Sequence, residues 1–169
     1  MNIRKSFYAS GVALALFGLF CSPNTSANTT VSTESQGNAK TTLSVEELVA
    51  AEQALIGEHL FSLQWISWEH FGVANIRKGE QGLEIEAEQA LDGNFVVLTG
   101  HIEIIDSKSF NFTGDIVTRV SYLNNGQTCQ RSGTFEFKVV GSRKYWRMQQ
   151  MDSPCDKVVD YIDIFFLDV

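Results

Sequence analysis

Apolar and polar residues alternate with a period of two along most of the chain after residue 57. The clearest run is Leu83–Ala90, in which Leu83, Ile85 and Ala87 are separated by glutamates. This period is typical of a β-strand that buries one face and exposes the other. The pattern therefore predicts a mainly antiparallel β-domain whose strands follow one another in sequence.

Short turn signals between these runs predict which residues lie opposite each other. Asp92-Gly93, Asn125-Gly126 and Gly141-Ser142 are dipeptides that tight hairpin turns favour, and Asp106-Ser107-Lys108 makes a fourth short connection. The Asp92-Gly93 turn predicts Leu83 opposite Ile102, Ile85 opposite Gly100, Ala87 opposite Leu98 and Glu84 opposite His101. The fourth connection predicts Ile104 opposite Phe110 and Gly100 opposite Gly114.

The other two turns extend the same sheet toward the C-terminus. Asn125-Gly126 predicts Tyr122 opposite Cys129 and Ile116 opposite Phe135. Gly141-Ser142 predicts Phe137 opposite Trp146, Phe135 opposite Met148 and Glu136 opposite Arg147. Aromatic pairs on one face and an ion pair on the other support this last register.

Residues 44–56 carry the signals of an amphipathic α-helix. Ser44 is the expected N-cap, and Glu47 completes a capping box. One apolar stripe runs along the helix and consists of Val45, Leu48, Leu55 and Ile56. We expect this stripe to cover an edge of the sheet.

Two further strands are predicted outside the hairpins, and together the strands define a fold class. Leu63–Arg77 is expected to form one long strand or two short ones, and Val158–Val169 forms a last strand that is apolar on both faces. Sequential strands with tight turns predict an all-β, up-and-down meander that closes into a small barrel or a curled sheet. A two-sheet β-sandwich is the alternative.

The start of the chain resembles a secretory signal. Arg4 and Lys5 precede the apolar run Val12–Phe20, and Thr25-Ser26-Ala27 offers a small-residue cleavage site. We expect residues 1–27 to be removed and the mature protein to be periplasmic or secreted.

The residues after the signal divide into a linker and one domain. Residues 28–42 are rich in Thr, Ser and Asn and predict a disordered polar linker. Residues 43–169 are long enough for a single β-domain with its own core. A lipoprotein interpretation through Cys21 is less well supported, because bulky Phe20 lies where a small residue is expected.

Two cysteines, Cys129 and Cys155, remain after removal of the signal. An even number of cysteines in an oxidising compartment favours a disulfide over a metal site. In the predicted register Cys129 lies opposite Pro154, and a bulge there would bring Cys155 alongside. We therefore predict a disulfide between them.

The net charge limits the classes of partner. The formal net charge is −7, and it becomes −9 when Arg4 and Lys5 leave with the signal. An acidic protein is a poor ligand for nucleic acid or for an anionic membrane surface. A cationic protein is a compatible partner, although an acidic surface also serves solubility alone.

No local signature of catalysis, metal binding or a cofactor is present in the sequence. The three histidines lack metal-ligand spacing, and there is no nucleophile elbow, phosphate loop or dinucleotide fingerprint. Asp152, Asp156 and Asp160 lack the spacing of a calcium loop and are interpreted as solvated turn residues. We predict no metal, no cofactor and no enzymatic activity, while a hydrolase with dispersed residues would leave no such signature.

Residues 143–147 form a basic-aromatic run in an otherwise acidic chain. Alternation sends Trp146 inward, which indicates ordinary strand structure. Arg143 and Lys144 then lie at an exposed hairpin tip, and the alternative interpretation is a patch that binds an anion or a glycan.

Arg131 is the sharpest candidate for a functional residue. It shares strand parity with Phe135 and Phe137 and is therefore predicted to point inward. The polar residues predicted around it are Thr118, Tyr122, Gln150 and Asp152. A buried charge persists only when it is paired and hydrogen-bonded. Either Arg131 orients the polar head of a ligand at a cavity mouth, or an Arg131–Asp152 pair closes one end of the barrel.

Two functions follow from these expectations. The first is an exported module that binds a small apolar or amphipathic ligand. The second is a protein–protein interaction module, an inhibitor or adaptor, whose acidic surface meets a cationic protein. A membrane β-barrel is less favoured, because the mature chain combines a long polar linker with a cysteine pair, and we expect no stable membrane insertion.

Overall fold

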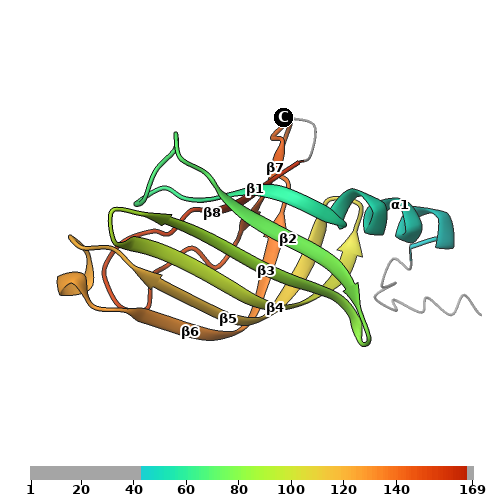
Figure 1. Ribbon diagram of the computed structural model, residues 1–169. Coiled ribbons are helices and arrows are strands. Elements are labelled where there is room, and N and C mark those ends of the chain that lie inside the picture. Colours follow the sequence, from blue (N-terminus) through green and yellow to red (C-terminus); the bar gives the residue numbers. More distant parts are fainter. Residues whose placement is uncertain (1–42, 167–169) are drawn as a thin grey trace, which may run out of the picture. The chain divides into compact units, whose positions relative to one another are not determined.

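The computed structural model describes residues 43–166, and Figure 1 shows their arrangement. The predicted signal and linker, and the last three residues, lie outside the described residues. Within residues 43–166, one helix precedes eight antiparallel strands, which form a closed barrel in sequence order. The expected up-and-down barrel is confirmed, and the sandwich alternative is not adopted.

The elements have the following bounds. Helix α1 is Val45–Leu55, β1 is Gly57–Leu63, β2 is Gly72–Gly79, β3 is Gly82–Leu91 and β4 is Asn94–Asp106. Strand β5 is Ser109–Arg119, the 3-10 turn η1 is Asn124–Gly126, β6 is Cys129–Lys138, β7 is Tyr145–Met148 and β8 is Ile162–Phe165. Pairing of β1 with β8 closes the barrel, with Phe61 opposite Ile164. Each strand thus pairs with a neighbour on both sides, although β6 and β7 pair only at Phe137 and Lys138.

The β3–β4 hairpin forms as the sequence predicts. Asp92 and Gly93 both have positive φ angles, 50° and 77°, as the turn requires. All four predicted pairs of this hairpin occur. The next connection also holds its predicted register, with Ile104 opposite Phe110 and Gly100 opposite Gly114.

The β5–β6 register differs from the prediction by four residues. Cys129 lies opposite Thr118 rather than Tyr122, and Phe135 lies opposite Phe112 rather than Ile116. The reason is that Asn125-Gly126 belongs to η1 inside a connection of several residues, and does not form a two-residue turn by itself.

The β6–β7 register differs from the prediction by two residues. Phe137 lies opposite Met148 rather than Trp146, and Lys138 rather than Glu136 lies opposite Arg147. Gly141 has a positive φ angle of 66° but lies within the longer connection 139–144. The predicted two-residue turn at Gly141-Ser142 is therefore wrong.

Both register errors are even numbers of residues, so the assignment of faces is unaffected. A strand shifted by two or four residues still points the same side chains inward. Phe135, Phe137, Trp146 and Met148 are all buried, as expected.

In the predicted run Leu63–Arg77, residues from Gly72 onward form strand as part of β2, and the last predicted strand is shorter than expected. Residues 64–71 form a loop rather than strand, and β1 begins at Gly57, before the predicted Leu63. In the described part of the C-terminal run, 158–166, only Ile162–Phe165 form a strand, while Val159 makes an isolated bridge to Asp152. The prediction that this strand is covered on both faces is confirmed for its first three residues, which are all buried.

Helix α1 begins and ends close to the predicted bounds. Ser44 Oγ accepts a hydrogen bond from the Glu47 amide, and the Glu47 carboxylate accepts one from the Ser44 amide, which is the expected capping box. The predicted apolar stripe packs only in part, because Leu55 is buried whereas Val45 is 78% exposed. The helix thus contacts the barrel through its C-terminal half, near β4.

Aromatic side chains fill the barrel. Phe110 stacks on Phe137 with ring centroids 5.2 Å apart, and Phe112 meets Phe137 edge to face at 6.3 Å. All three side chains are at most 1% exposed. An eight-stranded barrel is just wide enough for side chains to fill or for one small ligand, and here phenylalanines take the central space.

The barrel has two distinct ends (Figure 1). We call the end with α1 and the connections 107–108 and 139–144 the helix end. The opposite end carries the loops 64–71, 120–128 and 149–161, together with the cysteine pair, and we call it the disulfide end.

Candidate functional site

The segment 149–161, which we call the strap, packs on the disulfide end. It forms an irregular hairpin in which the Ser153 amide donates to Val158 O at 3.0 Å and the Asp160 amide donates to Met151 O at 2.7 Å. The Cys129–Cys155 disulfide joins the strap to β6, which confirms the predicted bond. Strap and barrel wall are thus held together covalently.

Arg131 points inward from β6, as the strand parity predicts. Its side chain is only 10% exposed, and its Nη2 lies 3.1 Å from Asp160 Oδ2. Its Nη1 donates to the backbone carbonyls of Gln150 and Asp152, both at 3.4 Å. The guanidinium also lies 5.8 Å from the centre of the Phe135 ring.

The predicted Arg131–Asp152 pair is wrong, because Asp160 supplies the carboxylate. Asp152 lies in the outgoing arm of the strap, where its carbonyl meets Arg131 while its side chain is exposed. The return arm of the strap then brings Asp160, interpreted from the sequence as solvated, to 5% exposure beside the arginine. The way in which the strap folds back on itself decides this pairing.

Burial governs the electrostatics of this pair. Removal from water raises the pKa of Asp160, and the opposing effects of Arg131 and of the hydrogen bond from Trp65 are smaller. Trp65 Nε1 donates to Asp160 Oδ1 at 3.1 Å, so both carboxylate oxygens have a partner. The pair therefore ties β6, the loop 64–71 and the strap together.

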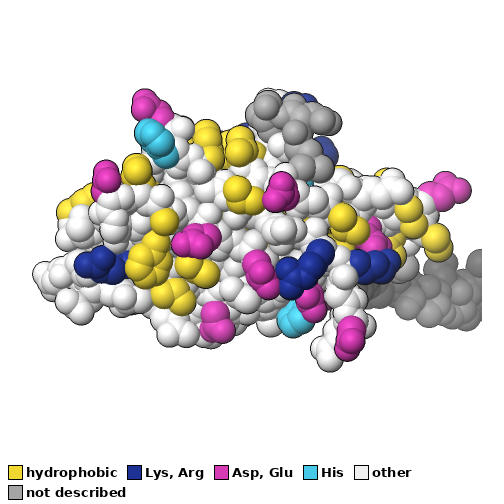
Figure 2. All heavy atoms as spheres, viewed as in Figure 1, with side chains coloured by type: hydrophobic (Ala, Val, Ile, Leu, Met, Phe, Trp, Pro, Cys, Tyr) yellow, Lys and Arg dark blue, Asp and Glu magenta, His cyan; other side chains and the backbone are white. Residues whose placement is uncertain are grey.

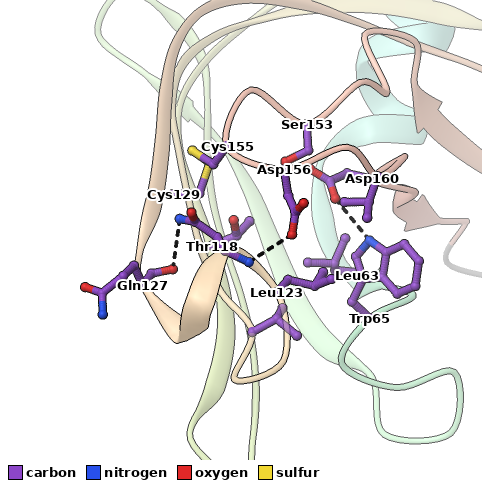
Figure 3. Close-up of a pocket in the computed structure, with 13 residues that line it drawn as sticks. Leu63, Trp65, Thr118, Leu123, Gln127, Cys129, Ser153, Cys155, Asp156 and Asp160 are labelled. Carbon is purple, nitrogen blue, oxygen red and sulfur yellow. Dashed lines mark hydrogen bonds between the residues drawn. A yellow bond between two sulfur atoms is a disulfide. The ribbon is translucent and has the colours of Figure 1, made fainter.

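A small cavity lies beside Asp160 and the disulfide (Figure 3). Its volume is about 20 Å³, and Trp65, Thr118 and Asp156 are among the residues that line it. A space of this size holds about one water molecule. The cavity therefore offers no room for an amphipathic ligand in this arrangement.

The other residues predicted to surround Arg131 are only partly brought together. Thr118 is half-buried and lines the cavity. Tyr122 is 64% exposed, and its hydroxyl donates to the Trp65 carbonyl. Gln150 is exposed, and its side-chain oxygen accepts from the Glu136 amide. The side chains of Tyr122 and Gln150 thus bond to the loop and to β6, and Gln150 contacts Arg131 only through its backbone carbonyl.

Gln89 anchors the loop 64–71, a role that the sequence did not indicate. Its side chain is 1% exposed, accepts from the Leu63 amide at 2.7 Å and donates to the carbonyls of Ser67 and His70. A buried amide with three partners fixes the backbone around it. The loop therefore holds Trp65 in a defined position against Asp160.

A second ion pair, between Arg147 and Asp163, lies on the outer face of β7 and β8. Two hydrogen bonds join the groups, from Nε to Oδ1 at 2.7 Å and from Nη2 to Oδ2 at 2.6 Å. Asp163 is fully buried, and the guanidinium lies 4.2 Å from the centre of the Tyr161 ring. The prediction that Glu136 pairs with Arg147 is wrong. The sequence did hold one signal for this pair: Asp163 is the single acid in the apolar run 161–166, and a buried carboxylate requires a cationic partner.

His59 is buried inside the helix end. Its two ring nitrogens lie 2.7 Å from the carbonyl oxygens of Phe165 and Leu55, so the ring links β8 to the end of α1. Over residues 43–166, no three His, Cys, Asp or Glu side chains are grouped to hold a metal ion. In the same stretch, no helix has both the length and the apolar character needed to cross a membrane.

Apolar side chains gather on the outer face where the barrel closes. We call Leu60, Phe71, Val73, Tyr145 and Phe165 the seam patch. Leu60 lies opposite Val73. The centroid of the Phe165 ring lies 5.1 Å from that of Phe71 and 5.3 Å from that of Tyr145. The exposed fractions of Leu60, Phe71 and Val73 are 43%, 38% and 48%. Figure 2 shows groups of apolar side chains on this side of the molecule, with acidic side chains between them.

Two carboxylates flank the seam patch. Glu58 lies two residues before Leu60 on β1 and so shares its outward face, and Glu88 lies opposite Val73 on β3. Both are exposed, and within residues 43–166 neither forms a salt bridge. The patch is therefore apolar with a negative rim.

Comparison with known proteins gives one family. The PM1083 family matches residues 31–166. Over 164 residues the chain is 48% identical to "Uncharacterized protein PM1083" of Pasteurella multocida (strain Pm70), a match that covers 97% of this chain and 100% of that protein. No solved structure matches significantly. With a family match over most of its length and a full-length relative at this identity, the chain belongs to the PM1083 family.

Proposed function

We propose that this protein is an exported protein–protein interaction module, and that its seam patch binds a cationic, apolar segment of a partner protein. The observation that carries this proposal is the group of exposed apolar side chains, Leu60, Phe71 and Val73, on a barrel whose centre is filled. Contiguous exposed apolar surface marks interaction sites more often than isolated apolar residues do.

Charge complementarity supports the choice of partner. Glu58 and Glu88 flank the patch, and the whole chain carries a formal net charge of −7. Lysine or arginine residues at the edge of an apolar segment would meet this rim and hasten association, more strongly at low salt. The predicted signal is consistent with export, so the partner would be met outside the cytoplasm.

A module for a small apolar or amphipathic ligand inside the barrel is less well supported. Sites for such ligands are usually about 300–1,000 Å³, whereas the cavity beside Asp160 measures about 20 Å³. The positive charge of Arg131 is also matched by Asp160. This geometry favours a structural role for Arg131 at the disulfide end.

Binding of two designed peptides tests the proposal by calorimetry. One peptide alternates Leu with Lys, and a matched peptide alternates Leu with Glu. The Leu/Lys peptide should bind, less tightly at higher salt, and the Leu/Glu peptide should not. Replacing both Leu60 and Val73 by Ser should raise the dissociation constant of the Leu/Lys peptide about tenfold, which corresponds to ~1.4 kcal/mol.

Charge variants complete this test. Glu58→Gln with Glu88→Gln should reduce the salt dependence of Leu/Lys binding. Glu103→Gln is the matched control, since Glu103 is an exposed acid on β4 opposite Asn111. Equal effects of the rim and control variants, or no effect of the Leu60 and Val73 substitutions, would show that the peptide binds elsewhere and that the proposal is wrong.

A further inference from the structure

An open hollow of about 370 Å³ lies at the helix end of the barrel. Its walls come from the β4–β5 turn, the connection 139–144 and Phe166. Two backbone hydrogen bonds fix these walls, from the Val139 amide to Lys108 O and from the Phe166 amide to Lys144 O, both 2.9 Å long. Segments from three parts of the chain thus border the hollow and are joined to one another by backbone hydrogen bonds.

Three cations line this hollow in a chain that is acidic as a whole. Lys108, Arg143 and Lys144 are all exposed. Within the described part of the chain, none of them forms a salt bridge. The nearest acid in the same turn, Asp106, accepts a hydrogen bond from the Lys108 backbone amide at 2.7 Å. Arg143 also lies 6.0 Å from the centre of the Tyr145 ring.

The rest of the lining adds hydroxyl groups and an apolar wall. Ser107 and Ser142 contribute hydroxyls, and Val139 and Phe166 contribute apolar surface. The centroid of the Phe166 ring lies 4.4 Å from that of buried Trp146, so Phe166 packs on the core residue. Ammonium, guanidinium and hydroxyl groups together donate to the oxygens of a phosphate, and an aromatic wall suits an apolar substituent.

We propose that this hollow is a binding site for a small phosphate monoester with an apolar body. The phosphate oxygens accept hydrogen bonds from Lys108, Arg143 and Lys144, and the apolar body lies against Phe166. The size of the hollow is within the range of small-molecule sites. This site is at the helix end and does not depend on the seam patch or on the function proposed for it.

Titration of the isotope-labelled protein by NMR, with phenyl phosphate as the probe, tests the proposal. Phenyl phosphate should shift the amide signals of 107–108 and 139–144 and bind more tightly than inorganic phosphate. Neutral phenyl glucoside should not bind there. An exposed charge pair contributes little free energy, so each single replacement by Gln should raise the dissociation constant only about threefold. The three positions are Lys108, Arg143 and Lys144. The triple variant should raise the dissociation constant about thirtyfold.

Two further variants make the outcome decisive. Lys157→Gln changes an exposed lysine of the strap and should leave binding unchanged. Phe166→Ala should weaken phenyl phosphate but not inorganic phosphate. The proposal is overturned if the triple variant binds like the wild type, if Lys157→Gln weakens binding equally, or if phenyl glucoside binds as tightly as phenyl phosphate. Binding that persists in the Leu60→Ser, Val73→Ser protein shows that the two proposed sites are separate.

Discussion

At the scale of single residues, the chain places two ion pairs in different surroundings. Arg131 meets Asp160 through one nitrogen at 3.1 Å inside the disulfide end, and Arg147 holds Asp163 through two hydrogen bonds on the outer wall. Breaking a buried pair leaves an uncompensated charge, which is strongly destabilising. Both arginines are therefore expected to stabilise the folded chain whether or not they contact a ligand.

The raised pKa of Asp160 predicts an unusual pH dependence. Below its ordinary value of 3.8, this carboxyl is protonated in the folded and the unfolded chain. As the pH rises, Asp160 loses its proton in the unfolded chain before it does so in the folded chain. The folded state therefore loses stability between the ordinary pKa and the raised pKa of the folded state. The free energy of unfolding of the wild type relative to Asp160→Asn should therefore fall with rising pH in this window.

Urea unfolding of both proteins between acidic and neutral pH measures this difference. Its slope cannot exceed about 1.4 kcal/mol per pH unit for one proton. Carboxylates common to both chains cancel in the comparison. A difference that increases with pH would mean that pairing with Arg131 lowers the pKa of Asp160 overall, contrary to the prediction.

At the scale of elements, the strap is an irregular part of the disulfide end. Its backbone forms an isolated bridge between Asp152 and Val159 instead of a continuous strand pair. The side chain of Gln64, from the loop 64–71, supports it by bonding to Val159 O and to the Tyr161 amide. The strap therefore depends on side-chain contacts and on the disulfide for its position.

Removing the disulfide should destabilise the protein and loosen the strap first. Cys129 and Cys155 are 26 positions apart, and a cross-link over such a loop contributes about 3.5 kcal/mol in the chain-entropy description. The Cys129→Ser, Cys155→Ser protein should lose about that much unfolding free energy. Amide hydrogen exchange should accelerate most in residues 149–161 and least in the β3–β4 hairpin.

Two outcomes would contradict this expectation. An unchanged unfolding free energy would show that the side-chain contacts alone hold the strap. Equal acceleration of exchange in the strap and in β3–β4 would show that the disulfide acts on the whole barrel instead of on one end.

At the scale of the whole molecule, the filling of the barrel depends on close backbone contact across the sheet. Gly100, Gly114 and Gly133 lie side by side on β4, β5 and β6. The space over the first two is occupied by the ring of Phe112, which is fully buried. The lack of side chains at Gly100 and Gly114 thus makes room for the Phe112 ring.

Gly114→Ala should therefore destabilise the barrel, although the position has no positive φ angle. An added Cβ would clash with the Thr99 carbonyl and would lie 2.7 Å from both Gly100 Cα and the Phe112 ring. Overpacking of this kind typically costs about 1–3 kcal/mol. Thermal and urea unfolding measure the loss, with Thr99→Ala on the exposed face as the control, which should stay within about 0.5 kcal/mol of the wild type. A loss no larger than that of the control would refute the close packing.

The sequence by itself determined the fold class, the disulfide, the helix cap and the faces of the strands. These follow from local rules, because strand alternation has a period of two and a two-residue turn such as Asp92-Gly93 fixes the register. The inward direction of Arg131 was predictable for the same reason. Even the registers that were wrong in β5–β6 and β6–β7 kept their inward faces.

Tertiary structure alone decided the partners of the polar residues. The strap and the loop 64–71 are irregular, and short-range patterns do not fix which residues such segments bring together. For this reason Asp160 rather than Asp152 meets Arg131, and Asp163 rather than Glu136 meets Arg147. The filled interior and the hollow at the helix end likewise arise from segments far apart in sequence, whose packing is set by the closure of the barrel.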